Sequence, residues 1–149
     1  MKVACGFAHA GVALHEVVID ELVDGGHEAL DLGAADDYPV IARAVARAIS
    51  DGRAARGTFV CGSGAGVSVA ASKVHGIRAA TVSDTYTAHQ SVEHDDLNVL
   101  CRGARVIGSE LARELMRAFL GARFSGAERP PTPPGAGQRD RTSRRRRAG

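Results

Sequence analysis

The sequence contains no tryptophan, two tyrosines and four phenylalanines, so aromatic residues make up only 4% of its 149 residues. Because hydrophobic residues still account for 44% of the chain, the core must be built from alanine, valine, leucine and isoleucine. Such a composition favours a parallel β-sheet that helices cover on both faces. No apolar run approaches the roughly 18 residues that a membrane-spanning helix needs, and strand-like residues follow Met1 and Lys2 directly. We therefore expect a cytoplasmic protein with one globular domain and no membrane partner.

Cysteine is also scarce. The three cysteines, Cys5, Cys61 and Cys101, are an odd number, and none belongs to a Cys-x-x-Cys pair. This argues against a disulfide framework and against a structural zinc site, and it fits a reducing compartment. His89 and Glu93 have the i, i+4 spacing of two metal ligands on a helix, but no third ligand accompanies them. We interpret them as a solvated pair and expect no metal site.

Charge is distributed unevenly along the chain. Residues 1–124 hold 12 lysines and arginines against 15 acidic residues, a net charge of −3, whereas residues 125–149 hold seven arginines against two acids. Four of the five prolines also lie in this last stretch. With little apolar surface to bury, residues 127–149 are predicted to be a disordered Pro/Arg-rich tail. An arginine run can bind nucleic acid, but this one lacks interleaved aromatic residues and a folded platform, so we favour a solvated tail without a nucleic-acid partner.

Strand-like and helix-like segments alternate along the rest of the chain. The predicted strands cover residues 3–6, 27–32, 58–61, 77–82 and 98–101. The predicted helices cover residues 12–22, 40–49, 67–74, 83–94 and 109–120, with Ser83 or Asp84 as the N-cap of the fourth. This alternation predicts a parallel sheet with right-handed crossovers. Because ligands of such sheets bind beyond the carboxyl ends of the strands, the loops that follow the strands are the candidate site.

The most informative of these loops is 61–66, with the sequence CGSGAG. It places a thiol, a hydroxyl and three glycines where a strand leads into a helix, and such a loop presents backbone N–H groups to an anion. A dinucleotide-binding loop is the alternative, but the spacing is GxGxG and not GxGxxG. The helix dipole favours the thiolate of Cys61, which would make this residue a usable base near neutral pH.

Six short sequence segments, one of which contains this loop, occur in order along the chain. They are residues 6–11 (GFAHAG), 37–39 (DYP), 61–68 (CGSGAGVS) with 70–73 (AASK), 76–79 (GIRA), 93–100 (EHDDLNVL) and 103–108 (GARVIG). Together they resemble the type B ribose-5-phosphate isomerases and the related galactose-6-phosphate isomerase subunits, over residues 1–126. The resemblance implies a sugar-phosphate isomerase domain in these residues. Its expected fold is a single three-layer α/β/α Rossmann-like domain with a five-stranded parallel sheet.

The resemblance also implies a reaction, the interconversion of an aldose and a ketose phosphate through a cis-enediolate without a metal or cofactor. The residue matching Cys61 moves the proton between C1 and C2, the residue matching Ser63 stabilises the oxyanion, and the residue matching His94 opens the furanose ring. An enediolate needs a base against a carbon acid and fixed donors where negative charge develops, and one thiol beside one amide-rich loop would supply both. The amides implied to act with Ser63 are those of Gly62, Gly64, Ala65 and Gly66.

The remaining implied roles concern binding and assembly. His9 and Arg105 would bind the phosphate, and Tyr38 would line the sugar site across the interface of a homodimer or a dimer of dimers. The family usually has Asp where this chain has Ala8, and commonly Asn where it has Asp95 in the substrate site. Prolines at the C-terminus also prevent the helix that carries the family's two phosphate-clamping arginines. These departures predict a changed ligand preference.

An alternative from another class is a catalytically altered or partner-dependent subunit that keeps the fold and binds a sugar or phosphate ligand. The departures from the family pattern would permit it. However, a subunit without turnover has no need of a base, an oxyanion donor and a ring opener at once. The presence of Cys61, Ser63 and His94 together therefore favours the enzyme.

Overall fold

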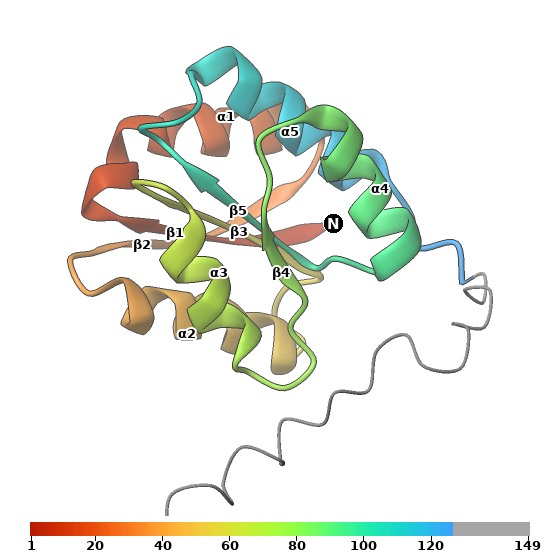
Figure 1. The fold of residues 1–149 in the computed structure, drawn as a ribbon, viewed down its shortest axis with the longest axis horizontal. Helices are drawn as coiled ribbons and strands as arrows, with labels where there is room; N and C mark the ends of the chain where they lie inside the picture. The colour runs from red at the N-terminus through yellow and green to blue at the C-terminus, as the bar shows by residue number, and fades with distance from the viewer. Residues whose placement is uncertain (127–149) are drawn as a thin grey trace, which may run out of the picture.

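The computed structural model describes residues 1–126, and the predicted tail lies outside these residues. Five parallel strands form one sheet in the order β2-β1-β3-β5-β4 (Figure 1). The strands are β1 (Lys2–Ala8), β2 (Glu28–Ala35), β3 (Arg56–Cys61), β4 (Ala79–Thr81) and β5 (Val99–Gly103). The helices are η1 (His9–Leu14, a 3-10 segment), α1 (His15–Asp24), α2 (Tyr38–Ser50), α3 (Ala65–Ser72), α4 (Thr85–Asp95) and α5 (Ser109–Gly121).

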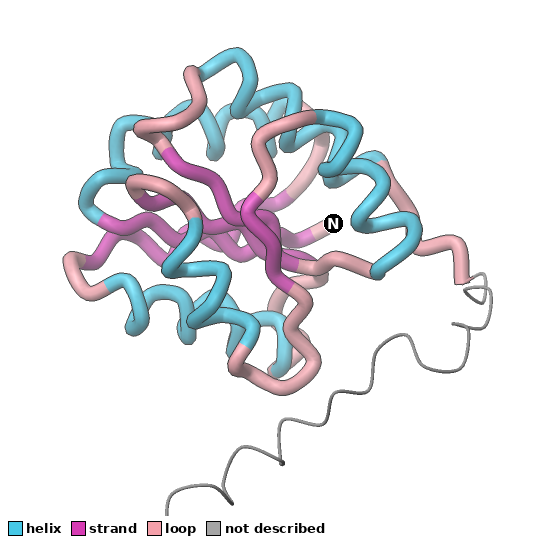
Figure 2. The backbone as a smooth tube through the Cα atoms, in the orientation of Figure 1, coloured by secondary structure: helices cyan, strands magenta, loops and turns pink. Residues whose placement is uncertain are grey.

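Two layers of helices cover the sheet. Helices α1, α4 and α5 pack on one face, and α2 and α3 pack on the other (Figure 2). This arrangement confirms the expected three-layer α/β/α Rossmann-like fold. It defines two ends of the sheet that are used below: the carboxyl end, where the strands finish, and the amino end, where they begin.

The core is aliphatic, as the composition predicts. The three central strands are buried along almost their whole length, and Phe7 and Phe59 are the large side chains that they contribute to opposite faces. On α5, Leu115, Met116 and Phe119 are fully buried against the sheet. Burying such a side chain stabilises the fold by about 1.5–3 kcal/mol relative to leaving it in water.

The first helix differs from its prediction. Its N-terminal part is the 3-10 segment η1 rather than α-helix, and Val12, expected on the buried face, is 48% exposed. The cause is a close approach of backbones: a Cβ built on Gly11 would lie 2.1 Å from the Val60 carbonyl oxygen. The chain can turn this tightly against β3 only because residue 11 has no side chain. The α-helix therefore begins later, at His15.

The other boundaries agree with the predictions to within a few residues. Asp84 is the N-cap of α4, and its carboxylate accepts a hydrogen bond of 2.7 Å from the Thr87 N–H. Strand β4 is shorter than predicted, because the backbone N–H of Arg78 is bonded to the Asn98 side chain and not to a neighbouring strand. Strand β2 is longer than predicted and contains an irregularity at Gly33, where φ is +78°.

One core residue is exceptional. Within residues 1–126, Arg102 of β5 is the largest fully buried side chain and has no carboxylate partner. Its guanidinium donates hydrogen bonds to the Ala112 carbonyl oxygen and to Thr58 Oγ1, while Nε has no partner. Burial lowers the pKa of this arginine to about 10. A buried cation without a counter-ion contributes little or negatively to stability.

Candidate active site

The loop between β3 and α3 lies at the carboxyl end of the sheet and carries the only accessible thiol. Cys61 is half-buried, and the Gly64 N–H donates a hydrogen bond of 2.9 Å to its sulfur. The next N–H along the loop, that of Ala65, donates a hydrogen bond of 3.3 Å to Ser63 Oγ. The thiol and the hydroxyl are thus both held by amides of one turn. The sequence predicted a loop that presents N–H groups to a ligand, and the structure bonds two of these groups to the side chains of Cys61 and Ser63.

Glycine is required where this loop touches its neighbours. Gly64 has a φ of +87°, and a Cβ at this position would lie 2.8 Å from the side chain of Thr81 and 3.0 Å from the backbone of Arg102. A Cβ on Gly103 would lie 2.6 Å from the backbone of Ser63. The loop therefore rests directly on the backbone at the end of β5.

Thr81 is a residue that the sequence reasoning missed. Its hydroxyl, at the end of β4, donates a hydrogen bond of 2.7 Å to the Gly64 carbonyl oxygen. The bond connects residues 17 positions apart and helps to hold the turn of the loop. No local sequence signal marks this threonine, because its partner is a backbone atom of another β-α loop.

Three of the predicted binding residues surround the loop at the same end of the sheet. A Cβ built on Gly62 would lie 3.6 Å from the Arg105 guanidinium, and one built on Gly66 would lie 3.1 Å from the Tyr38 ring. His9 follows β1, and its Nδ1 lies 3.6 Å from a carboxylate oxygen of Asp36. Both members of that pair are almost fully exposed, so their attraction is weak in water.

A groove continues from this end of the sheet between α2 and α3. It holds about 290 Å³, and Tyr38, Gly66, Arg43 and Lys73 are among the residues that line it. Arg43, Lys73 and Arg105 take part in no ion pair within the described residues. Cations that form no ion pair with the rest of residues 1–126 suit an anionic ligand.

His94 and Asp95 lie elsewhere. Helix α4 begins beyond the carboxyl end of β4 and runs back along the sheet, so its last residues lie at the amino end (Figure 1). There the Asn98 carbonyl oxygen accepts a hydrogen bond from the N–H of Gly57, near the start of β3, whereas Cys61 ends that strand. Within one chain the structure therefore does not bring Cys61 and His94 together. The alternation of strands and helices already predicts this position of His94, because a helix between two parallel strands must end near the start of the second strand.

The other two cysteines are structural, as expected. Cys5 and Cys101 are buried in β1 and β5, on opposite faces of the sheet. Burial raises the pKa of each thiol to about 12. A thiol in this state is neutral and unreactive at physiological pH.

Metal ligands do not converge in residues 1–126. His89 Nδ1 lies 3.3 Å from a carboxylate oxygen of Glu93, and both side chains are about half exposed. The two form a half-exposed pair on one turn of α4. Over the described residues there is no cluster of three histidine, cysteine or acidic side chains, and no helix is long and apolar enough to span a membrane.

The fold and this loop define a class: an α/β protein with an accessible thiol in a glycine-rich loop beyond the carboxyl ends of parallel strands. Comparison with known proteins makes the assignment specific. The sequence model of the Ribose/Galactose Isomerase family matches residues 3–131. The chain belongs to this family, and the expected enzyme class, aldose–ketose isomerase, is confirmed.

Individual relatives are similar over most of their length. The chain is 42% identical to ribose-5-phosphate isomerase B of Escherichia coli over 129 residues, which cover 84% of this chain and 87% of that protein. It is 39% identical to D-erythrulose-4-phosphate isomerase of Pectobacterium atrosepticum, covering 85% and 86%. The solved structure of Clostridium thermocellum ribose-5-phosphate isomerase B superposes with a TM-score of 0.82 at 40% identity, covering 85% of this chain and 88% of that one.

Proposed function

We propose that this protein interconverts an aldose phosphate and a ketose phosphate through an enediolate, with Cys61 as the proton-transferring base. The observation that carries the proposal is the accessible sulfur of Cys61, which accepts a hydrogen bond from the Gly64 amide in the loop between β3 and α3. Of the three thiols, this is the one that a ligand can reach. Relatives named as isomerases of ribose, erythrulose and galactose phosphates support the same class of substrate.

The mechanism follows from what the loop offers. The sulfur of Cys61 takes a proton from the carbon next to the substrate carbonyl and returns it to the adjacent carbon, which exchanges the positions of carbonyl and hydroxyl. Negative charge develops on oxygen during this step, and the amides of residues 62–66 with the Ser63 hydroxyl stabilise it. These donors are fixed by the close contacts of Gly64 with β4 and β5 and of Ser63 with Gly103, so they need little reorganisation.

The phosphate would lie among the cations at the same end of the sheet. Arg105 is adjacent to Gly62, and His9 follows β1 beside the loop. Tyr38 contacts Gly66 and would lie along the sugar. Their placement around one loop supports the predicted binding role for these three residues.

Opening of a cyclic substrate requires a second copy of the chain. A sugar bound at Cys61 is out of reach of the same chain's His94, which lies beyond the other end of the sheet. A homodimer in which one chain presents His94 and Asp95 to the loop of the other would complete the site. Sedimentation equilibrium of the full chain tests this, because a monomer at the concentrations of the assay would exclude the shared site.

The substrate is best identified with a panel of tetrose, pentose and hexose phosphates together with the free sugars, assayed without added metal. We expect turnover of at least one phosphate and none of the corresponding free sugar. Ala8 and Asp95 stand where the family usually has Asp and Asn, so ribose 5-phosphate is not expected to be the best substrate. Binding of a sugar phosphate without turnover of any would support a ligand-binding subunit instead.

The base is tested by Cys61→Ser. This variant should lower turnover by about three orders of magnitude or more and leave the affinity for ligand within severalfold, because a hydroxyl is a far weaker base than a thiolate. Cys101→Ser, on a neighbouring strand, is the control for loss of a cysteine. Near-normal turnover of Cys61→Ser would remove Cys61 from the mechanism.

A further inference from the structure

The corner that follows His94 has an unusual backbone. Asp96 caps α4 with φ 53° and ψ 43°, and it is the only residue other than glycine with a positive φ in residues 1–126. This conformation is uncommon for residues with a side chain and persists only where the surroundings hold it. Something must therefore stabilise the chain between His94 and the start of β5.

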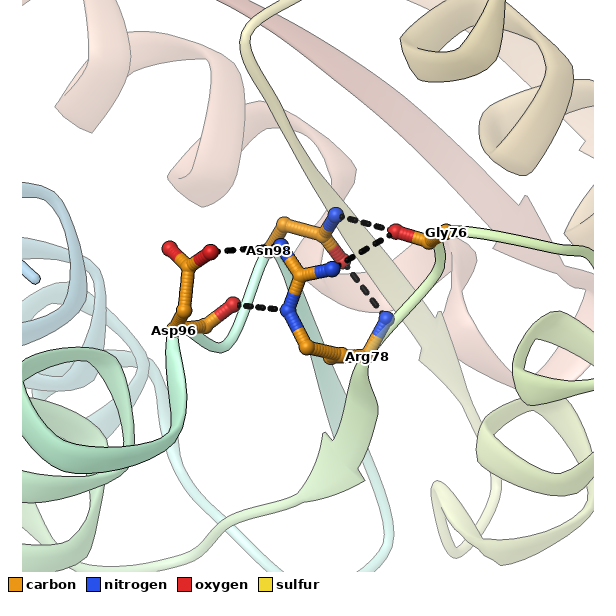
Figure 3. Close-up of polar contacts among 4 residues, drawn as sticks. All are labelled: Gly76, Arg78, Asp96 and Asn98. Carbon is orange, nitrogen blue, oxygen red and sulfur yellow. Dashed lines mark hydrogen bonds and ion pairs between the residues drawn. The ribbon is translucent and has the colours of Figure 1, made fainter. Parts of the chain in front are cut away.

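Arg78 supplies that stabilisation from the neighbouring loop. Its guanidinium donates three hydrogen bonds: from Nε to the Asp96 carbonyl oxygen at 2.6 Å, from Nη2 to the Asp96 carboxylate at 2.9 Å and from Nη1 to the Gly76 carbonyl oxygen at 3.0 Å (Figure 3). The arginine thus binds both the backbone and the side chain of the residue in the strained conformation. A planar guanidinium can do this with fixed geometry, which a lysine cannot.

Asn98 completes the connection. Its side-chain oxygen accepts a hydrogen bond of 2.8 Å from the Arg78 N–H, and its amide donates one of 2.9 Å to the Gly76 carbonyl oxygen (Figure 3). On the helix side, the Asp96 and Leu97 N–H groups return to the carbonyl oxygens of Val92 and Ser91. The backbone is fixed on both sides of the corner, so the direction in which α4 presents its last turn is fixed as well.

The His94 side chain has weaker constraints of its own. Its Nδ1 lies 3.3 Å from the Gln90 amide, its Nε2 lies 4.0 Å from Glu93, and the side chain is 53% exposed. A half-exposed imidazole can be aligned with a partner's site only if the backbone that carries it is rigid.

We infer that Arg78 is a positioning residue for ring opening: by holding Asp96, it sets the orientation in which one chain presents His94 to the loop of a second chain. The inference rests on the proposed function. Arg78 itself touches no reacting atom. Its loss should therefore impair only those substrates that need His94.

Two substrates separate this role from general stability. The pentose phosphate, an aldopentose 5-phosphate, closes into a furanose ring through its 4-hydroxyl, whereas an aldotetrose 4-phosphate cannot, because the hydroxyl that would close its ring is esterified. For Arg78→Met we expect kcat on the pentose phosphate to fall about tenfold or more while kcat on the tetrose phosphate stays within about twofold. KM should change little for either substrate. Arg78→Lys should restore only part of the loss. Arg53→Met, which removes an exposed arginine from an ion pair with Asp51, is the matched control and should change neither.

A double variant tests whether Arg78 acts through His94. On the pentose phosphate, Arg78→Met combined with His94→Asn should be no slower than His94→Asn alone, because the orientation of an absent imidazole has no effect. Multiplicative losses would show that Arg78 acts independently and would overturn the inference. Equal losses of Arg78→Met on both sugars would overturn it too.

Amide hydrogen exchange provides a readout that does not depend on activity. In Arg78→Met, exchange at Asp96 and Leu97 should speed up at least about tenfold, with exchange in β1 and β3 unchanged. Unchanged exchange at the corner would overturn the inference while leaving the proposed function intact. Absence of turnover by the wild-type protein on every sugar phosphate would overturn the proposed function, and the inference with it.

Discussion

The two ends of the sheet are held together by different means. At the carboxyl end, backbones touch each other: Gly11 lies against Val60, and Gly103 lies against Ser63. At the amino end, polar side chains bridge the gaps: Arg78 and Asn98 connect the loops before β4 and β5, and Arg56 binds the end of α5.

The contrast has a chemical reason. Where the loop of residues 61–66 meets β5 through glycine, its own N–H groups hold the reactive side chains: the Gly64 and Ala65 N–H groups donate to Cys61 Sγ and Ser63 Oγ. At the amino end, the guanidinium groups of Arg78 and Arg56 donate to backbone carbonyl oxygens, which fixes the connecting segments to one another. The chemistry is therefore expected at the carboxyl end, and the amino end contributes only what it presents to another chain.

The largest effect should come from forcing a side chain between the touching backbones. In Gly103→Ala the new Cβ would lie 2.6 Å from the Ser63 backbone. The backbone of the loop would have to shift to relieve this contact. We expect the free energy of unfolding to fall by about 1–3 kcal/mol and turnover to fall by about 10²-fold. Gly108→Ala, where no atom lies within 4 Å of the added Cβ, should change both little. Chemical denaturation and steady-state kinetics measure the two quantities, and an inert Gly103→Ala would contradict the tight contact.

A substitution at the amino end should lower the stability of the protein without lowering its turnover. Arg56→Met removes hydrogen bonds to the carbonyl oxygens of Phe119 and Ala122 and a cation–π contact with the Phe119 ring, whose centroid is 5.3 Å away. Because the guanidinium is only part-buried, we expect unfolding to become easier by about 1–2 kcal/mol. Turnover per folded molecule should be unchanged. A loss of turnover as large as that of Gly103→Ala would erase the distinction between the two ends.

Arg102 lies on β5, inside the core. Its replacement shows whether hydrogen bonds from a buried guanidinium stabilise the fold. Replacing it with methionine removes a buried cation that lacks a carboxylate and has an unpaired Nε. We expect the free energy of unfolding to rise, or to fall by no more than about 1 kcal/mol. Thermal or urea unfolding would measure it. A loss above about 3 kcal/mol would mean that the bonds to Thr58 and Ala112 outweigh the cost of burial.

The smallest effect concerns the helix cap at the carboxyl end. The backbone N–H and the hydroxyl of Thr87 lower the pKa of the Asp84 carboxyl. A carboxyl with a depressed folded-state pKa stabilises the fold above its usual pKa of about 4, and this contribution disappears as the pH falls through the lowered value. The wild type should therefore be more stable than Asp84→Ala at neutral pH, and the difference should shrink in acid. Unfolding measured at both pH values tests this, and a constant difference would contradict a charged cap.

Much of the architecture was predictable because its causes are local. The alternation of strands and helices, the Asp84 cap and the loop of residues 61–66 each depend on residues close together in the chain. The 3-10 start at His9 was not predictable, since the close contact of Gly11 with Val60 involves a strand almost 50 positions later. The same holds for Thr81, whose partner in the site loop is far from it in sequence.

By itself, the sequence determined the class of fold, the position of the thiol in an amide-rich loop and the family to which the chain belongs. These follow from periodicity, composition and short motifs, which act through neighbouring residues. Only the tertiary structure decided which residues meet: that Arg105 and Tyr38 lie beside the loop of residues 61–66, that Arg78 holds Asp96, and that His94 lies at the opposite end of the sheet. The reason is that such contacts depend on the direction and pairing of whole strands and helices, which are set when the sheet closes around its core.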